Sequence, residues 1–380
     1  MGRKDGFTLK AGEVVRYPKG TARLVIPDGV RELTSCFAYD DFIQEIVIPP
    51  SVTKIGESAF LDCDGLERIT IPGTVQIIEN GAFECCECLC SITIEEGVRS
   101  IGNHAFDGCS ISHLSLPSTL THVGCGAFGD YPTVTDEHGL QILDGILIRA
   151  PKSLKGSFDI PKGIRVIADH AFSGCVDLTQ IIIPESITSL AEYAFYGCTS
   201  LQTVKLPKSL QLIGNGAFQG CSSLTSIEIP NGTIEIGSGA FSECSSLSEI
   251  NIPDSTTKIG RSAFSGCSSL AEFGIPDSVT EIGEYAFSGC AGLKHISLPS
   301  KITHIQLGSF AGCTGLISVD IPKSVTEIAL MAFKGCTALQ KIMLPEALNI
   351  IDRQAFSGCA ALTHIRVPKC VTDIYCDTFD

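Results

Sequence analysis

The 380-residue sequence has no tryptophan, few charged residues and no hydrophobic segment long enough to span a membrane. Charged residues make up 18% of the sequence and hydrophobic residues 44%. Because there is no tryptophan, the core must come from Ile, Leu, Val, Phe and Cys. A formal net charge of −15 without any basic run argues against a nucleic-acid partner, since phosphate binding needs clustered Lys and Arg. The first residues include no apolar stretch typical of a signal peptide. As it stands, the sequence therefore predicts no membrane insertion and a cytoplasmic location.

What the sequence has in abundance is one repeated unit of 23 residues. Fifteen of its 19 phenylalanines occupy one position of that unit, and apart from one interval of 22 and one of 44 they are 23 residues apart. These residues are Phe37, Phe60, Phe83, Phe106, Phe128, Phe172, Phe195, Phe218, Phe241, Phe264, Phe287, Phe310, Phe333, Phe356 and Phe379.

Each part of the unit has a structural interpretation. The pattern Leu-x-x-Ile-x-Ile, as at Leu66–Ile71, ends in the alternation of a short half-buried strand. The proline that follows, here Pro72, lacks the N–H that a ladder needs and therefore marks a corner. Residues 52–55 predict a second short strand, and Gly56 a turn. The segment that carries Phe60 inward is long enough only for a 3₁₀ or single helical turn.

One such unit cannot bury a core alone, so neighbouring units must stack and cover one another. The sequence therefore predicts a repeat solenoid, a right-handed coil of about 15 rungs of 23 residues, with mostly short β-strands. Two irregular stretches divide it. We expect a capping hairpin at 1–27, repeats at 28–128, an irregular hairpin insert at 129–158, and repeats at 159–380 that end in a degenerate unit with Tyr375 and Thr378.

Twelve of the 19 cysteines follow the repeat phenylalanine by three residues and form a predicted ladder. Neighbours in this ladder would be about 5 Å apart, a distance that also permits disulfides. Packing is the favoured interpretation, because a free cysteine is a small hydrophobic residue that suits a repeated inner corner. The ladder consists of Cys63, Cys86, Cys109, Cys175, Cys198, Cys221, Cys244, Cys267, Cys290, Cys313, Cys336 and Cys359.

The segment Cys85-Cys86-Glu-Cys88-Leu-Cys90 is the one plausible metal site, since zinc needs four convergent thiolates or imidazoles. We expect Cys86 to point into the core while Cys88 and Cys90 flank an inward leucine, so the four thiols should not converge. No catalytic motif or histidine ligand spacing is present. The sequence therefore predicts no enzyme activity, no metal and no cofactor.

The unit Ser-Val-Thr-x-Ile-Gly-x-x-Ala-Phe-x-Gly-Cys-x-x-Leu, as at residues 278–293, closely resembles the BspA-type leucine-rich repeats of bacteria and parasitic protists. The resemblance covers nearly the whole chain. It implies a leucine-rich-repeat fold and adhesion to a protein partner, such as a host or matrix protein, and it raises a secreted or cell-surface location as the alternative to the cytoplasm.

In leucine-rich repeats the Leu-x-x-Ile-x-Ile strand lines a concave sheet, and solenoids bind partners through such extended surfaces. The residues beside its inward isoleucines are therefore the predicted binding residues, with acidic ones on the middle rungs and basic ones on the last two. They are Arg68, His113, Lys205, Glu228, Glu249, Glu272, His295, Asp320, Lys341, His364 and Arg366. The alternative functions are a structural scaffold without a specific ligand and a thiol or metal protein that uses Cys85–Cys90. The sequence does not indicate an oligomeric state.

Overall fold

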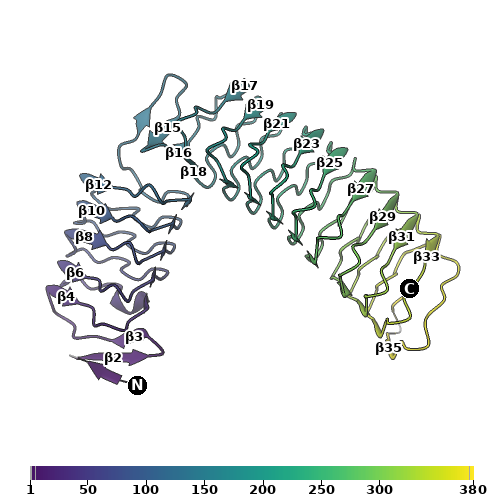
Figure 1. Cartoon of the computed structure of the whole chain (residues 1–380), viewed down its shortest axis with the longest axis horizontal. Helices are drawn as coiled ribbons and strands as arrows, with labels where there is room; N and C mark the ends of the chain where they lie inside the picture. The colour runs from purple at the N-terminus through teal and green to yellow at the C-terminus, as the bar shows by residue number, and fades with distance from the viewer. Residues whose placement is uncertain (1, 5, 376) are drawn as a thin grey trace. The chain divides into compact units, whose positions relative to one another are not determined.

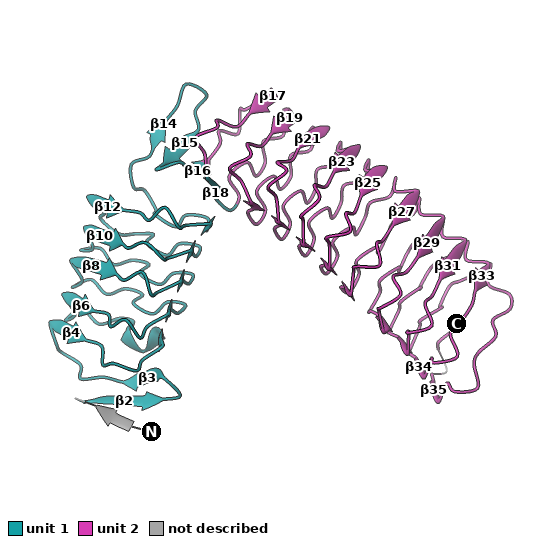
Figure 2. Ribbon diagram, viewed as in Figure 1, with its two compact units in different colours: residues 1–148, 165–169 teal, residues 149–164, 170–380 magenta. Residues whose placement is uncertain are grey.

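The computed structural model describes residues 2–4, 6–375 and 377–380. It shows a β-solenoid of about 16 turns that recur about every 23 residues, which confirms the predicted repeat solenoid (Figure 1). In this part of the chain the only helix is the 3₁₀ helix Ser35–Phe37. By contacts the molecule divides into two compact units (Figure 2). Unit 1 comprises residues 1–148 and 165–169, and unit 2 comprises residues 149–164 and 170–380.

Each regular turn contributes two strands, which we call the first strand (the Leu-x-x-Ile-x-Ile segment) and the second strand (the Val-Thr-x-Ile segment). In unit 1 the first strands form one parallel sheet of β4 (Arg23–Val25), β6 (Glu45–Val47), β8 (Arg68–Ile71), β10 (Ser91–Ile94) and β12 (His113–Ser115). The second strands form another sheet of β5 (Glu32–Leu33), β7 (Lys54–Ile55), β9 (Ile77–Ile78), β11 (Ser100–Ile101) and β13 (His122–Val123).

Two irregular segments accompany these sheets. At the N-terminus β1 (Gly2–Lys4), β2 (Phe7–Lys10) and β3 (Glu13–Arg16) run antiparallel and continue the second-strand sheet. Within the predicted insert 129–158 an antiparallel pair begins a four-stranded sheet, whose strands are β14 (Val134–Thr135), β15 (Gln141–Leu143), β16 (Ile146–Arg149) and β18 (Val166–Ile167). The predicted domain boundaries themselves stay a prediction.

In unit 2 both faces are divided into shorter sheets. The first strands form three groups: β17 (Gly156–Asp159), β19 (Leu178–Ile182) and β21 (Thr203–Lys205); β23 (Ser226–Glu228) and β25 (Glu249–Asn251); and β27 (Glu272–Gly274), β29 (His295–Ser297), β31 (Ser318–Asp320) and β33 (Lys341–Ile342). The second strands form two: β20 (Ser189–Leu190), β22 (Leu212–Ile213), β24 (Glu235–Ile236), β26 (Lys258–Ile259) and β28 (Glu281–Ile282); and β30 (His304–Ile305), β32 (Glu327–Ile328), β34 (Ile350–Ile351) and β35 (Asp373–Ile374).

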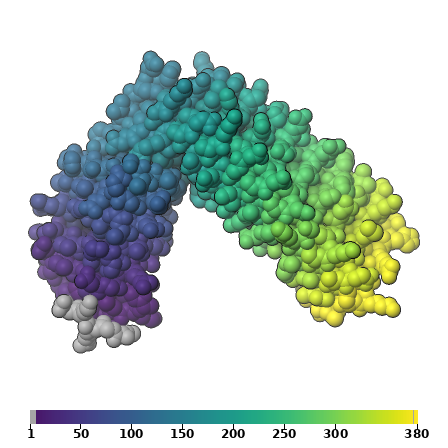
Figure 3. Space-filling view, in the orientation of Figure 1, coloured from purple at the N-terminus to yellow at the C-terminus, as the bar shows by residue number. Residues whose placement is uncertain are grey.

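The repeat phenylalanines form the centre of each unit. In unit 1 the rings of Phe37 and Phe60 stack at 5.0 Å between centroids, and in unit 2 those of Phe356 and Phe379 stack at 5.6 Å. Burial of one such side chain is worth about 1.5–3 kcal/mol, so the column supplies much of the core. Side chains fill the spaces that the ribbons leave between successive turns within each unit (Figure 3).

The corners that carry these phenylalanines are successive turns rather than the predicted helical turn, except at Ser35–Phe37. The physical reason is that left-handed residues flank the phenylalanine on both sides. Beside Phe106 the φ angles of His104 and Gly108 are 53° and 74°. A residue in the left-handed region cannot continue a right-handed helix. The glycine of the Gly-Cys pair is thus explained by its conformation.

The opposite corner begins at the proline of most repeats, as predicted. The carbonyl oxygen of Pro72 accepts a hydrogen bond of 3.0 Å from the amide of Val75, and Pro276 pairs with Val279 in the same way. This bond closes a four-residue turn between the first and second strands. The last repeat keeps the usual phenylalanine corner despite its substituted residues. Thr378 is buried, and its amide donates to the carbonyl of Tyr375.

Candidate binding face

The first-strand face carries the predicted binding residues, all of which are exposed. Nine of them lie in strands: Arg68, His113, Lys205, Glu228, Glu249, Glu272, His295, Asp320 and Lys341. The other two, His364 and Arg366, lie in a segment that forms no strand, so the expected last strand is absent from the described part of the turn. That the face is concave stays a prediction.

The strand register divides these residues into two columns rather than one. Glu249 pairs with Ser226, whereas Glu228 pairs with Asn251, so Glu228 lies two residues further along its strand than Glu249 does. In the next sheet Glu272 pairs with His295, which places Glu272 in the same strand position as Glu249. The sequence treated all three glutamates as one cluster, and the structure puts them in a diagonal arrangement.

These three glutamates nevertheless line one shallow, open depression of about 690 Å³. Its other lining residues are uncharged, among them Ser226, Asn251 and Ala271. The depression lies at an interruption of the first-strand face, between β25 and β27. No backbone hydrogen bond of the described chain joins residues 248–252 to residues 271–275 there. Three exposed carboxylates and an open strand edge therefore meet on unit 2.

A polar network follows on the next two strands of this face. The Ser297 hydroxyl donates to Oδ2 of Asp320 at 2.9 Å, and Nε2 of His295 lies 3.3 Å from the same oxygen. Nδ1 of His295 lies 2.9 Å from Oγ of Ser318. All except half-buried Ser318 are exposed, and nothing encloses a reacting group, so the cluster orders this surface without the features of a catalytic site.

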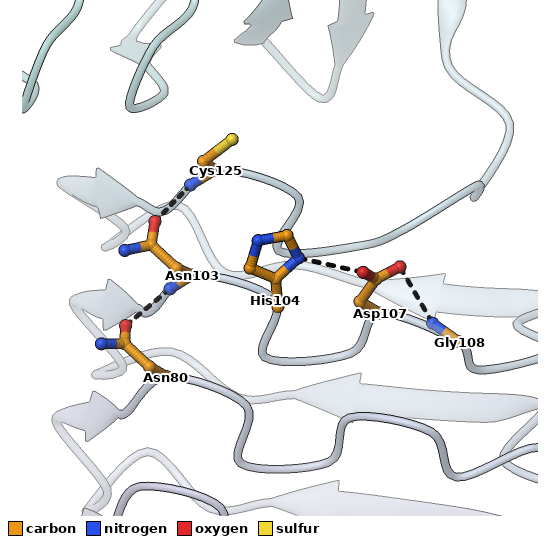
Figure 4. A network of polar contacts seen from close by, with 6 residues as sticks. All are labelled: Asn80, Asn103, His104, Asp107, Gly108 and Cys125. Carbon is orange, nitrogen blue, oxygen red and sulfur yellow. Dashed lines mark hydrogen bonds and ion pairs between the residues drawn. The ribbon is translucent and has the colours of Figure 1, made fainter.

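Unit 1 shows how polar side chains join successive turns (Figure 4). The amide oxygen Oδ1 of Asn80 accepts a 2.8 Å hydrogen bond from the backbone N–H of Asn103. Asn103 repeats the contact to the backbone N–H of Cys125 at 2.7 Å. Nδ1 of His104 lies 2.9 Å from Oδ2 of Asp107 within one turn. The two asparagine bonds satisfy backbone donors at a corner, and all three contacts are structural.

The ladder cysteines pack in the core, and they also make a hydrogen bond that the sequence did not predict. The Cys244 thiol donates to the carbonyl oxygen of Phe218, 26 residues earlier, at 3.2 Å. Every other ladder thiol does the same to the phenylalanine of the preceding turn, except Cys175, which donates to Pro151. Burial raises the pKa of the thiols of Cys63, Cys198, Cys244 and Cys313 to about 12.

The Cys85–Cys90 cluster does not converge on one point. Cys86 is buried, whereas Cys85, Cys88 and Cys90 are exposed. Cys85 takes the left-handed corner position that glycine usually occupies, with φ of 59°. Among the described residues no group of three or more His, Cys, Asp and Glu could hold a metal ion. No helix in this part of the chain has the length and hydrophobicity of a membrane span.

The predicted binding residues include none of the polar residues on the second-strand face. There Lys258 lies 2.9 Å from Glu235, and Arg261 lies 2.9 Å from Glu284 and over the Tyr285 ring at 5.5 Å. The threonines before these strands use their hydroxyls to bond the preceding turn's carbonyl, as in unit 1 from Thr121 to Arg99 at 3.2 Å. The available signal was the outward first residue of each second strand, which alternates in charge along Glu235, Lys258, Glu281, His304 and Glu327.

Comparison with known proteins identifies the repeat. A family described as the BspA type leucine-rich repeat region matches in six copies, over residues 19–135, 152–271 and 257–380. A leucine-rich repeat protein from Bacteroides ovatus is 26% identical, covering 95% of this chain and 91% of its own, with a TM-score of 0.40. The leucine-rich repeat protein of T. pallidum is 29% identical over 57% of this chain and 82% of its own, with a TM-score of 0.38.

A leucine-rich cell surface protein from Faecalibacterium prausnitzii is 24% identical, covering 96% of this chain and 93% of its own, with a TM-score of 0.32. No curated protein matches the chain. The TM-scores to these three structures are low. The relationship that is established is therefore to the repeat family, which matches along most of the chain.

Proposed function

Because this chain belongs to the BspA-type leucine-rich repeat family, we propose that it is a non-enzymatic, adhesion-type module that binds a protein partner through the first-strand face of unit 2. The observation that carries the proposal is the depression of about 690 Å³ lined by Glu228, Glu249 and Glu272. None of these carboxylates forms an ion pair within the described chain, so each is available to a partner's basic side chain.

Electrostatics favours a basic partner surface. Like charges on neighbouring turns, such as Glu249 and Glu272, repel one another, and a partner that presents Lys or Arg relieves this repulsion as it binds. Complementary charge of this kind raises the association rate and selects among partners. A host or matrix protein as the partner, and either a cytoplasmic or a cell-surface location, stay predictions that this proposal does not need.

The test reverses the three charges. In the variant Glu228→Lys/Glu249→Lys/Glu272→Lys, capture of proteins from native or host extract should fall at least tenfold for the partners that wild-type protein retains, measured by quantitative mass spectrometry. Partner binding by the wild type should also weaken as salt rises, because exposed charges are screened.

A matched control reverses three exposed acids elsewhere, Glu57, Asp130 and Asp254, and changes the net charge equally. Retained capture by the triple variant removes the acidic depression from the proposal. Equal loss in both variants would assign the effect to net charge rather than to this site. If wild-type protein captures nothing, the scaffold alternative is favoured instead.

A further inference from the structure

A second interrupted ladder lies on the opposite set of strands of unit 2, between β28 and β30. On neighbouring turns the amide after each second-strand isoleucine donates to the preceding isoleucine carbonyl. Gly283 bonds Ile259 in this way at 2.9 Å, and Ala329 bonds Ile305 at 2.9 Å. Gln306, which occupies the same position on the turn between them, makes no such bond to Ile282. From β20 to β34 the ladder therefore lacks this one connection in an otherwise regular series.

Four backbone groups are left without a hydrogen-bond partner in the described chain. They are the N–H groups of Thr303 and Gln306 on one side, and the carbonyl oxygens of Thr280 and Ile282 on the other. The equivalent donor one turn later, the Thr326 amide, bonds Thr303 at 2.8 Å. Unpaired groups of this kind form an open strand edge on each side of the interruption.

The interior is continuous beneath this opening. The rings of Phe287 and Phe310 stack at 5.5 Å, and the Phe287 amide donates to Ser309 at 2.9 Å. The first strands β27 and β29 remain paired. The opening is therefore confined to the second-strand face.

A cleft of about 470 Å³ lies over this interruption. Its lining includes the unpaired segments themselves, with Thr280, Glu281 and Ile282 from one turn and Ile302, Thr303, His304 and Gln306 from another. A smaller adjoining space has an apolar lining that includes Ile282, Leu298, Ile302, Ile305 and Phe310. The volume falls in the range of about 300–1,000 Å³ that is usual for ligand pockets.

We propose that this cleft, which we call the ladder cleft, binds an extended peptide segment that runs parallel to β28 and β30. The peptide's carbonyls accept from the N–H groups of Thr303 and Gln306, and its own N–H groups donate to the carbonyls of Thr280 and Ile282. Added strands gain their affinity from main-chain hydrogen bonds of this kind and their specificity from alternate side chains. The site is independent of the first-strand face and of the function proposed for it.

The side-chain preference follows from the neighbours of the missing connection. Inward side chains of the peptide meet the isoleucines of the cleft and should be apolar. The outward side chain between them lies beside Glu281 and His304, and it should be a lysine. In unit 1 a lysine at the equivalent position lies between two glutamates, with Lys54 3.2 Å from Glu32 and 3.0 Å from Glu79. The cleft offers the acidic partner on one side, Glu281, while His304 on the other side lies 3.6 Å from Glu327.

The probe is therefore an acetylated and amidated fluorescent peptide with the sequence Ser-Val-Thr-Lys-Ile, as in residues 51–55. We expect saturable binding to the full chain by fluorescence anisotropy. The same peptide with N-methylated alternate amides should bind at least tenfold more weakly, because it cannot donate to the cleft. The peptide Ser-Val-Thr-Glu-Ile, as in residues 278–282, should also bind several-fold more weakly.

Two variants place a bulky side chain at equivalent exposed positions. Thr303→Tyr blocks the ladder cleft and should weaken binding at least tenfold, whereas Thr121→Tyr, on an uninterrupted ladder in unit 1, should leave it unchanged. Equal thermal unfolding of both variants shows that folding is intact. Failure of the peptide to bind at millimolar concentration, or undiminished binding by the N-methylated peptide or by Thr303→Tyr, overturns the proposal.

Hydrogen exchange tests the cleft without any dependence on affinity. In the free chain the amides of Thr303 and Gln306 should exchange at least tenfold faster than those of Thr326 and Ala329, and the probe should slow them. Equal protection of the two pairs in the free chain would overturn the proposed open edge.

Discussion

Unit 1 and unit 2 are built from the same repeat, yet their sheets differ in continuity. In unit 1 the first strands β4–β12 form one sheet and the second strands β5–β13 another, each without interruption, while β18 belongs to the separate four-stranded sheet that begins in the insert. In unit 2 the first strands form three sheets and the second strands two. The phenylalanine stack shows no such difference, because adjacent rings lie 5.1 Å apart at Phe83–Phe106 and 5.5 Å apart at Phe241–Phe264.

This difference indicates that the interior columns hold the turns together, while the backbone ladders at the surface are free to open. Both surface depressions of unit 2 described above lie at interruptions of this kind. The repeat thus separates stability, which lies inside, from the edges that a partner can use.

The largest expected effect concerns alkaline pH and distinguishes the units by their thiols. Burial raises the pKa of seven ladder thiols in unit 2 above their ordinary value of 9.0. The hydrogen bond between Cys336 and Cys359, together with burial, raises the pKa of Cys336, and the same hydrogen bond lowers the pKa of Cys359. In unit 1 burial raises the pKa of the thiols of Cys36, Cys63 and Cys85 and of the Tyr17 hydroxyl, and a hydrogen bond with Cys109, together with burial, raises the pKa of Cys86. Above pH 9 the unfolded thiols ionise and the folded ones do not, so stability present below pH 9 is lost as pH rises towards 12. Each buried ladder thiol contributes about 1.4 kcal/mol per pH unit.

Unit 2 should therefore unfold at a lower pH than unit 1. The chain has no tryptophan, so single reporters at exposed sites, Ile77→Trp in unit 1 and Ile234→Trp in unit 2, can follow each unit by fluorescence. Constant fluorescence between pH 6 and 8 serves as the control. Simultaneous unfolding of both reporters would contradict the expected order.

The next effect concerns the shared core. Phe83→Ala in unit 1 and Phe264→Ala in unit 2 each remove a fully buried ring, and each should lower the free energy of unfolding by about 3–5 kcal/mol. Denaturant unfolding followed by the two reporters measures the loss. Met343→Ala, at an 82% exposed position, should change stability by less than about 0.5 kcal/mol. A much smaller loss in unit 2 would show that its core does not hold the turns as proposed.

A smaller, local effect concerns the interrupted first-strand face. The Lys294 amide donates to Ala271 at 3.2 Å, whereas the Ala271 amide has no hydrogen-bond partner in the described chain. The Ala271 amide should therefore exchange with solvent at least tenfold faster than that of Lys294, as measured by NMR. Similar rates would mean that the ladder between β25 and β27 closes in solution and that the two units do not differ there.

The smallest effect concerns matched surface ion pairs. Lys54 in unit 1 contacts two glutamates, and the hydrogen bonds that it donates to Glu79 and Glu32 raise its pKa, while in unit 2 the hydrogen bond that Lys258 donates to Glu235 raises the pKa of Lys258. Exposed pairs contribute about 0.2–1 kcal/mol. Lys54→Met and Lys258→Met should therefore destabilise slightly, and the loss should disappear in 1 M salt. A larger loss that persists in salt would indicate packing by the lysine stem instead.

The sequence allowed the solenoid, its period and its central columns to be predicted, because each depends on residues repeated at fixed spacing. The phenylalanines equivalent to Phe60 and the cysteines equivalent to Cys63 recur so regularly that each set must occupy one interior position of the repeat. The left-handed corners were missed because the residue at that position varies, as Ser58 and His104 show, so no single residue type marks it.

The interruptions could not be predicted from local sequence. Gln306 replaces the glycine found at Gly260 and Gly283, but Glu79 does the same in unit 1 and still donates to Ile55 at 2.9 Å. Whether a ladder bond forms therefore depends on how two whole turns pack. The same holds for the binding face, where exposure of Glu228 and Glu249 was predictable but their two separate columns depended on strand register.

The hydrogen bonds that the ladder thiols make between turns all run in one direction along the solenoid. Nearly every ladder cysteine donates to a carbonyl of the turn before it, as Cys290 does to Phe264, and none of these bonds points towards the following turn. Loss of the Cys290 thiol therefore removes one of the two hydrogen bonds that the Phe264 carbonyl accepts, leaving the one from the Cys267 amide at 3.2 Å, and it leaves a space in its own turn. The loss should therefore weaken the preceding turn more than the following one. Replacing Cys290 with alanine should loosen the turn of Phe264 more than the turn of Phe310.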